Sequence, residues 1–226
     1  EVTRQAARMI LADDDFATIV AAVREGRVIF QNIRKALRYL LSSNMGEVLT
    51  VFFGVVLADA IGLAAGATGE VALPLLATQI LWINLITDSG PALAMGVDPA
   101  VGDPMAQPPR RPGDRVIDGR MWASVLGVGA VMAAVTLLTL DAYLPGGWIE
   151  GERDLANART AAFTTLVLAQ MFNCLNARSA SASAFRDLFV NGWLWAAIAL
   201  SVLLQVACVQ LPLMNAAFGT VPLSAA

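Results

Sequence analysis

The chain has 226 residues, of which 57% are hydrophobic and only 15% charged, and its mean hydropathy is +0.64. Soluble domains are about 45–50% apolar and about 25% charged, and disordered chains are poor in apolar residues. Both classes are therefore excluded, and an integral membrane protein with the lipid bilayer as its partner is expected. A net charge of −3 with Lys35 as the single lysine argues against a nucleic-acid partner.

The region before the first apolar span predicts a cytoplasmic helix. Residues 9–12 are a short apolar run that fits a strand, and a lone strand needs partners from elsewhere. From Phe16 onward, apolar residues recur at helical spacing, and Asp15 is placed to act as the N-cap. Either the arginines of this amphipathic helix contact anionic lipid, or the helix is a rigid stalk that joins a cytoplasmic domain to the membrane. We favour the stalk.

Five segments are apolar enough to be membrane helices, which need about 20 residues each. They are Met45–Leu63, Leu75–Gly96, Met121–Tyr143, Thr160–Leu175 and Trp193–Leu211. The predicted fold class is therefore all-α: a polytopic transmembrane helix bundle of five spans with a cytoplasmic N-terminal stalk helix. The fourth span is the shortest and carries Gln170 and Asn173.

The basic residues predict the orientation of these spans. Thirteen of the fifteen lie before the first span, between the second and third, or between the fourth and fifth. Cytoplasmic flanks carry the excess of lysine and arginine, so the N-terminus is expected to be cytoplasmic. Arg153 and Arg159 lie on the opposite side. Asp59 and Asp141 are close to the outer ends of their spans and are expected to be solvated.

Two of the spans carry polar side chains that share one helix face, because their spacing is three or four residues. These residues are Asn44 and Glu47 in the first span, and Asn84, Thr87 and Asp88 in the second. Pro91 follows at once, and a proline leaves backbone carbonyls without their helical donor. Carboxylates, amide oxygens, a hydroxyl and free carbonyls form the ligand set of a hard cation such as Ca²⁺.

The alternative interpretation is that these groups only hydrogen-bond between helices, which suits Ser42 and Ser43. It fits Glu47 together with Asp88 poorly, because two buried acids need a cation or protons to offset their charges. Ion binding is therefore the preferred interpretation. For Gln170 alone, helix packing and ligation fit equally well.

Four stretches resemble P-type cation-transporting ATPases. Residues 10–30 resemble the end of the phosphorylation domain, 39–49 (YLLSSNMGEVL) the fifth transmembrane helix, 79–96 (QILWINLITDSGPALAMG) the sixth, and 103–112 the cytoplasmic loop that follows. The resemblance is closest to the calcium-pump branch, because Asn84 stands where sodium/potassium pumps tend to carry an acid. It implies that 1–15 end the phosphorylation domain, 16–44 form the stalk, and 45–226 form a transmembrane domain with helices five to nine.

This resemblance also implies a ligand set. Asn44, Glu47, Asn84, Thr87 and Asp88 match the cation ligands of calcium pumps, and Asp88 matches the ligand that can bridge two sites. Gln170 stands where the two-site pumps have a glutamate, so one site, or one weakened site, is expected. Ca²⁺ is the expected transported ion, although Mn²⁺ also accepts oxygen ligands.

The motifs for phosphorylation, dephosphorylation and Mg²⁺ binding, and the nucleotide-binding domain, do not occur in these 226 residues. ATP and Mg²⁺ are therefore expected only in the intact pump, whose N-terminal part is the missing partner. We expect an incomplete C-terminal part of a pump in a bacterial plasma membrane. The alternative is a non-enzymatic cation channel or a regulatory membrane protein derived from such a pump.

Overall fold

The computed structural model describes residues 10, 15–63, 72–100, 102–106, 108–109, 113, 115–149, 151–152, 154–178 and 189–223. Its elements are α2 (Phe16–Val56), α3 (Ala77–Trp82), the π-helical turn η1 (Ile83–Thr87), α4 (Ser89–Gly96), the 3₁₀ turn η2 (Pro104–Ala106), α5 (Gly119–Tyr143), α6 (Leu155–Ala177), α7 (Gly192–Gln210) and α8 (Pro212–Phe218). The described residues contain no strand, so the all-α class is confirmed for them. Of the run at 9–12, only Ile10 is described, and the expected strand lies outside the described residues.

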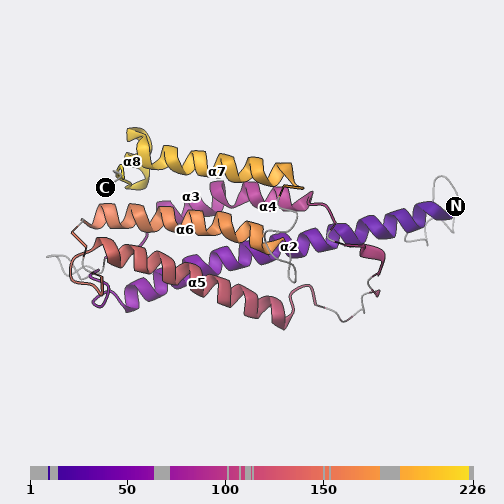
Figure 1. Ribbon diagram of the computed structural model, residues 1–226, viewed down its shortest axis with the longest axis horizontal. Coiled ribbons are helices and arrows are strands. Elements are labelled where there is room, and N and C mark those ends of the chain that lie inside the picture. The colour runs from indigo at the N-terminus through magenta and orange to yellow at the C-terminus, as the bar shows by residue number, and fades with distance from the viewer. Residues whose placement is uncertain are drawn as a thin grey trace.

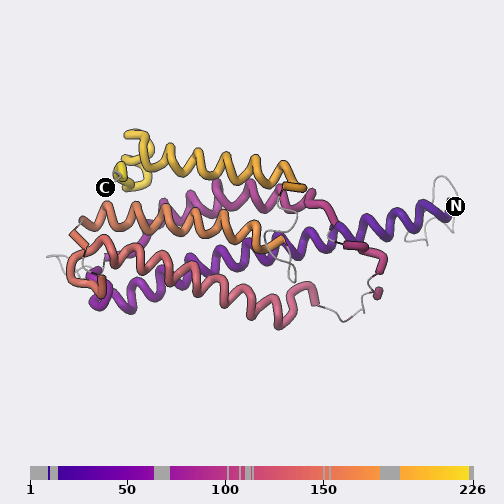
Figure 2. Tube along the Cα trace, in the orientation of Figure 1, coloured from indigo at the N-terminus to yellow at the C-terminus, as the bar shows by residue number. Residues whose placement is uncertain are grey.

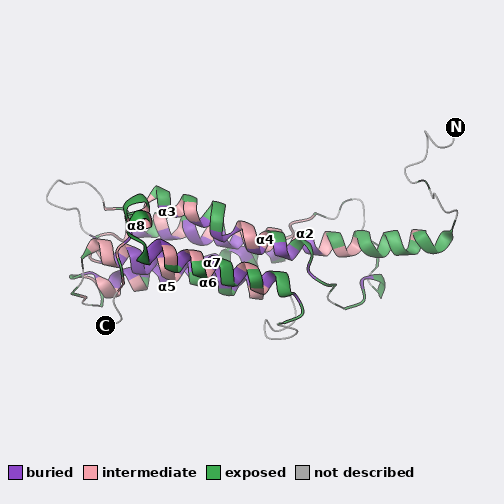
Figure 3. Ribbon diagram, turned by 90° about the horizontal axis from the view of Figure 1, so that it is seen from above, coloured by how far each residue is buried: buried purple, intermediate pink, exposed green. Residues whose placement is uncertain are grey.

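The helices form an elongated bundle in which α2 packs against α4, α5 and α6 (Figures 1 and 2). α5 also packs along α6, and α4 packs along α7, so α7 and the short α8 form one edge of the bundle. The first half of α2 projects beyond the other helices, and the start of α2 lies at the opposite end of the bundle from α8 (Figure 1). This projecting part is largely exposed, whereas the buried residues gather where the helices overlap (Figure 3).

Helix α2 is a single uninterrupted helix of 41 residues. The Asp15 carboxylate accepts a hydrogen bond from the amide of Ala17 at 2.9 Å, which confirms the predicted N-cap. At 1.5 Å per residue the helix is about 60 Å long, about twice the thickness of a bilayer's hydrocarbon core. Such a length accommodates both a membrane span and an extramembrane extension.

The first predicted span ends too late, because α2 stops at Val56 and not at Leu63. The chain then turns, and Gly62 adopts a left-handed conformation with φ of +69°. A Cβ at this position would lie 2.6 Å from the carbonyl oxygen of Pro145. Ile61 and Leu63 are buried in the same hydrophobic cluster as Leu140. Packing against the end of α5 therefore ends the helix.

Small residues let α2 and α5 approach closely. A Cβ added to Gly129 would lie 2.8 Å from Cγ of Met45 and 3.1 Å from the backbone nitrogen of Gly46. A Cβ added to Gly46 would lie 2.8 Å from Cε of Met132. Close backbone approach through small residues is a common way to pack membrane helices, because apolar burial supplies no driving force between helices in lipid.

Side-chain caps fix where three other helices begin. Asp118 accepts from the amide of Met121 at the start of α5, Asp154 caps α6, and Asn191 caps α7. Each cap satisfies a backbone N–H that lacks a partner within its own helix. Helix α5 therefore begins two residues before the predicted third span, and α7 begins one residue before the predicted fifth span. Helix α6 begins five residues before the predicted fourth span.

Three of the described helices, α2, α5 and α7, are long and apolar enough to cross a membrane. α6 has 23 residues and carries more polar side chains, and the second predicted span is divided among α3, η1 and α4. Large apolar side chains such as Leu126, Leu138 and Leu203 are exposed on the outside of the bundle. Such a surface suits contact with lipid, and the chain is a multi-pass membrane protein.

Asp141 is not solvated, contrary to the expectation from its position near a helix end. Its side chain is fully buried, and its two carboxylate oxygens accept from the amides of Trp148 and Ile149 at 2.9 Å each. The carboxylate thus pairs backbone donors of the turn after α5, and burial is tolerated because both oxygens are hydrogen-bonded. Asp59 is exposed, as expected.

Candidate cation site

The predicted polar residues meet where α2, η1 and α6 face one another in the bundle. Glu47 on α2 is 4% exposed, and both of its carboxylate oxygens accept from side-chain amides. Asn84 Nδ2 donates to Oε2 at 2.6 Å, and Gln170 Nε2 donates to Oε1 at 2.9 Å. The structure therefore brings together three predicted site residues that are 37 to 123 positions apart in the sequence.

Asp88 lies beside this trio and is 1% exposed. The hydroxyl of Tyr39 donates to Oδ1 of Asp88 at 2.7 Å, and Tyr39 is itself completely buried. The sequence interpretation assigned no role to Tyr39. Its position eight residues before Glu47, about two helical turns along α2, was the available signal.

The backbone around Asp88 departs from regular α-helix. The π-helical turn Ile83–Thr87 stands directly before it, and Pro91 follows. Because proline has no N–H, it cannot donate to the carbonyl of Thr87 four residues earlier. The hydroxyl of Ser201 on α7 donates to that carbonyl instead, at 3.2 Å. π-helical turns inside α-helices are frequent at functional sites.

Thr87 and Asn44 contribute differently to the arrangement. Thr87 is completely buried, and its hydroxyl donates to the carbonyl of Ile83 at 3.1 Å. Asn44 is exposed, and its amide donates to the carbonyl of Leu40 in its own helix at 2.8 Å. Thr87 is therefore buried in the bundle beside Asp88. Asn44 does not join the group around Glu47.

Neighbouring polar residues on α6 extend the contact between α6 and α2. Asn173, three residues after Gln170, donates to the hydroxyl of Ser42 at 2.7 Å. Ser42 in turn donates to the carbonyl of Arg38 at 2.7 Å. The Asn173–Ser42 bond is the interhelical type of contact predicted for Ser42. The polar stripe of α6 therefore matches the polar stripe of α2 at two levels of the bundle.

The donor chemistry of the cluster fits a hard cation. Two of its buried oxygens have no hydrogen-bond partner among the described residues: Oδ2 of Asp88 and Oε1 of Gln170. Buried polar atoms are nearly always paired in folded proteins, so these oxygens are suited to a ligand. Within the described ranges, no group of three or more acidic, histidine or cysteine side chains lies together.

A second buried polar cluster lies nearer the N-terminal end of the bundle, and the sequence interpretation missed it. The Asp98 carboxylate accepts from Lys35 Nζ at 2.5 Å, from Arg178 Nε at 3.2 Å and from Asn191 Nδ2 at 2.9 Å. Asn32 donates to the backbone carbonyl of Asp98 at 2.7 Å. We call these five residues the Asp98 cluster. It joins α2, the end of α4, the end of α6 and the start of α7.

Comparison with known proteins places these features in a family. Residues 72–226 match the family described as "Cation transporting ATPase, C-terminus". The chain is 37% identical over 224 residues to a calcium-transporting ATPase of Bacillus subtilis (strain 168), and 38% identical over 225 residues to the "Probable cation-transporting ATPase F" of Mycobacterium bovis. Each alignment covers 99% of this chain and 23% of the relative. The chain therefore spans about a quarter of the length of these relatives.

Proposed function

This chain belongs to the family of the cation-transporting ATPase C-terminus, and we propose that it is the cation-binding membrane part of an ATP-driven pump for Ca²⁺ or a similar divalent cation. In this proposal residues 1–15 end a phosphorylation domain, 16–44 form a cytoplasmic stalk, and 45–226 form the transmembrane domain. Five spans cross the membrane, with the second built from α3, η1 and α4. The N-terminus is cytoplasmic, and the bacterial relatives support a bacterial plasma membrane.

The observation that carries the proposal is the pair of buried acids, Glu47 and Asp88, surrounded by amide and hydroxyl oxygens. Two buried carboxylates without a buried cation beside them need a bound ion or protons to offset their charge. Asn84 and Gln170 present their N–H groups to Glu47. Half a turn of each amide about its last bond presents the amide oxygen instead, which suits a bound Ca²⁺.

The long helix α2 supports a mechanism for coupling. It carries Glu47 and also the projecting segment that would join the phosphorylation domain. ATP and Mg²⁺ act in the missing N-terminal part of the pump, where an aspartate is phosphorylated. Movement of that domain would shift α2 against η1 and α6, and so change the distances among the oxygens around Glu47. Two conformations with different cation affinity are what alternating access requires.

Asp88→Asn in the intact pump tests the site. The substitution keeps the size of the side chain and removes one of two buried charges, so calcium-dependent phosphorylation from ATP is expected to be lost. Asp59→Asn is the matched control, because it makes the same substitution at an exposed carboxylate outside the cluster. Wild-type calcium affinity in the Asp88→Asn pump would show that the ion binds elsewhere.

Gln170→Glu tests the number of ions. Gln170 already contacts Glu47, so a third carboxylate there would favour a further bound cation. The expected result is a higher count of bound Ca²⁺ per phosphoenzyme, measured with a radioactive isotope. An unchanged count would assign Gln170 to helix packing.

A further inference from the structure

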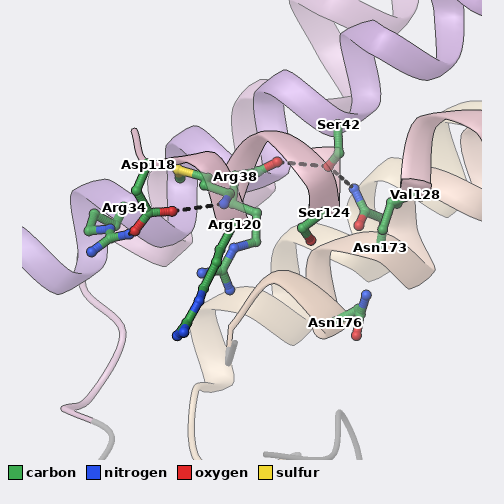
Figure 4. Close-up of a pocket in the computed structure, with 10 residues that line it drawn as sticks. Arg34, Arg38, Ser42, Asp118, Arg120, Ser124, Val128, Asn173 and Asn176 are labelled. Carbon is green, nitrogen blue, oxygen red and sulfur yellow. Dashed lines mark hydrogen bonds and ion pairs between the residues drawn. The ribbon is translucent and has the colours of Figure 1, made fainter. Parts of the chain in front are cut away.

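A pocket of about 420 Å³ opens between α2, α5 and α6 at the arginine-rich end of the bundle (Figure 4). Its lining residues are Arg34, Arg38, Ser42, Asp118, Arg120, Met121, Ser124, Val128, Asn173 and Asn176. Figure 4 shows the three arginines and Asp118 on one side, and the serine and asparagine side chains on the other. It is separate from the group around Glu47.

Positive charge exceeds negative charge in this pocket. Arg34 pairs with Asp118 at 2.7 Å. The amide of Met121 and the Arg34 guanidinium hold the pKa of Asp118 below its usual value, so this carboxylate stays charged. Arg38 has a buried Nε without a hydrogen-bond partner in the described chain, and Arg120 is exposed at the pocket mouth. Three guanidinium groups therefore face one carboxylate, which favours an anionic ligand.

The pocket continues into an apolar groove between α5 and α6. This groove has a volume of about 530 Å³ and shares Val128, Asn173 and Asn176 with the pocket. Further along it is lined by Val131, Val135 and Phe172 and by neighbouring small side chains. All three of these apolar side chains are at least 45% exposed. The basic pocket thus opens directly into an exposed apolar groove between α5 and α6.

We propose that one anionic phospholipid binds here, with its phosphate among Arg34, Arg38 and Arg120 and an acyl chain in the α5–α6 groove. Guanidinium groups bind phosphate oxygens through paired N–H donors. Basic pockets between membrane helices on the cytoplasmic side bind lipid head groups. Ser124 and Asn176 supply further donors to head-group oxygens. The charged end and the apolar end match the two ends of one lipid molecule.

A soluble phosphate ion fits less well, because it uses the arginines and leaves Val131 and Val135 uncovered. A zwitterionic lipid such as phosphatidylcholine also fits less well, because its ammonium group would meet the excess positive charge. Phosphatidylglycerol, with one negative charge and a hydroxylated head group, is therefore the probe of choice. The inference depends on the membrane location of the chain and not on the identity of the transported ion.

The test measures phosphatidylglycerol binding to the intact, delipidated pump by native mass spectrometry. Arg38→Gln and Arg120→Gln are each expected to weaken binding about fivefold, the usual effect of one basic side chain near anionic lipid. Arg24→Gln, which removes the same charge from an exposed position of α2 outside the pocket, should leave binding unchanged. Calcium-dependent phosphorylation, measured in parallel, distinguishes failure of this inference from failure of the proposed function.

A second pair of variants tests the groove. Val131→Trp fills the apolar channel without altering an arginine, and it should weaken phosphatidylglycerol binding. Leu203→Trp adds the same bulk to an exposed position of α7 and should have no effect. Equal binding by the arginine variants and the wild type overturns the proposal. So does inorganic phosphate binding as tightly as the lipid, or a wild-type pump that binds no lipid because another protein segment fills the pocket.

Discussion

Asp98→Asn is expected to be the most destabilising single change in the bundle outside the cation site. The carboxylate of Asp98 is shared by Lys35 and Arg178, whose side chains are only 8% and 9% exposed. With asparagine in its place, two buried positive charges would face a neutral amide. Removing one partner of a buried ion pair costs about 3–5 kcal/mol, so the free energy of unfolding should fall by about that amount.

The structure also ranks the neighbouring variants. Lys35→Met leaves Asp98 paired with Arg178 and Asn191, so its cost should be near that of one charge-assisted hydrogen bond, about 1.5–3 kcal/mol. The double variant Lys35→Met/Asp98→Asn should lose less than the sum of the two single losses, because the buried lysine charge is gone. Arg34→Gln breaks the ion pair between Arg34 and Asp118, whose side chains are 32% and 46% exposed. Its effect on the free energy of unfolding should be at most about 1 kcal/mol.

Denaturant unfolding in detergent micelles, followed by circular dichroism, measures these differences. The refuting result is a loss for Asp98→Asn no larger than that for Arg34→Gln. Strictly additive losses in the Lys35 and Asp98 cycle would also contradict the reasoning, because contacting residues are expected to couple.

The other predictions concern packing and capping. Gly129→Ala should lower the free energy of unfolding by about 1–3 kcal/mol, because the added carbon meets Met45 and the backbone of Gly46. Gly127→Ala is the control, because its added carbon meets nothing within 4 Å and should leave stability unchanged. Equal unfolding midpoints for the two variants would contradict the close α2–α5 packing. Asp141→Ala leaves two amides of the turn after α5 without their acceptor, so the free energy of unfolding should fall by about 1–3 kcal/mol. Hydrogen exchange at residues 148 and 149 should rise, and unchanged exchange there would contradict this role of Asp141. Asn191→Ala removes the cap of α7, which alone is worth about 0.5–2 kcal/mol, and it also removes a donor to the Asp98 carboxylate. Hydrogen exchange in the first turn of α7 should therefore rise, and unchanged exchange there would argue against the cap.

The parts of the fold that depend on local chemistry were predictable. The apolar spacing after Phe16 and the Asp15 cap predict α2, and both occur in the structure. The end of α2 was not predictable, because the residues from Leu57 to Leu63 are apolar enough to continue the helix. Contacts of Ile61 and Gly62 with the end of α5 decide it, and such tertiary contacts have no local signal.

The candidate site shows the same division. Asn84 and Asp88 are four residues apart and lie about 40° apart around a helix, whereas Asn44 and Glu47 are about 60° apart. That angle is wide enough for Glu47 to be buried while Asn44 is exposed. The Asp98 cluster lies beyond sequence reasoning, because Lys35 and Asp98 are 63 positions apart and only the packing of α4 against α2 brings them together.

Because α2 is unbroken, a tilt of the helix about its contact with α5 moves different parts of the helix by different distances. Near Gly46 the helix packs closely against α5, because Gly129 on the facing helix has no side chain. From Gly46 to Phe16 the helix extends for about 45 Å. A tilt of about 10° around that point therefore displaces the far end by about 8 Å, while Glu47 moves by a small fraction of that distance. A large displacement of the projecting end of α2 would therefore become a small displacement beside the two buried acids.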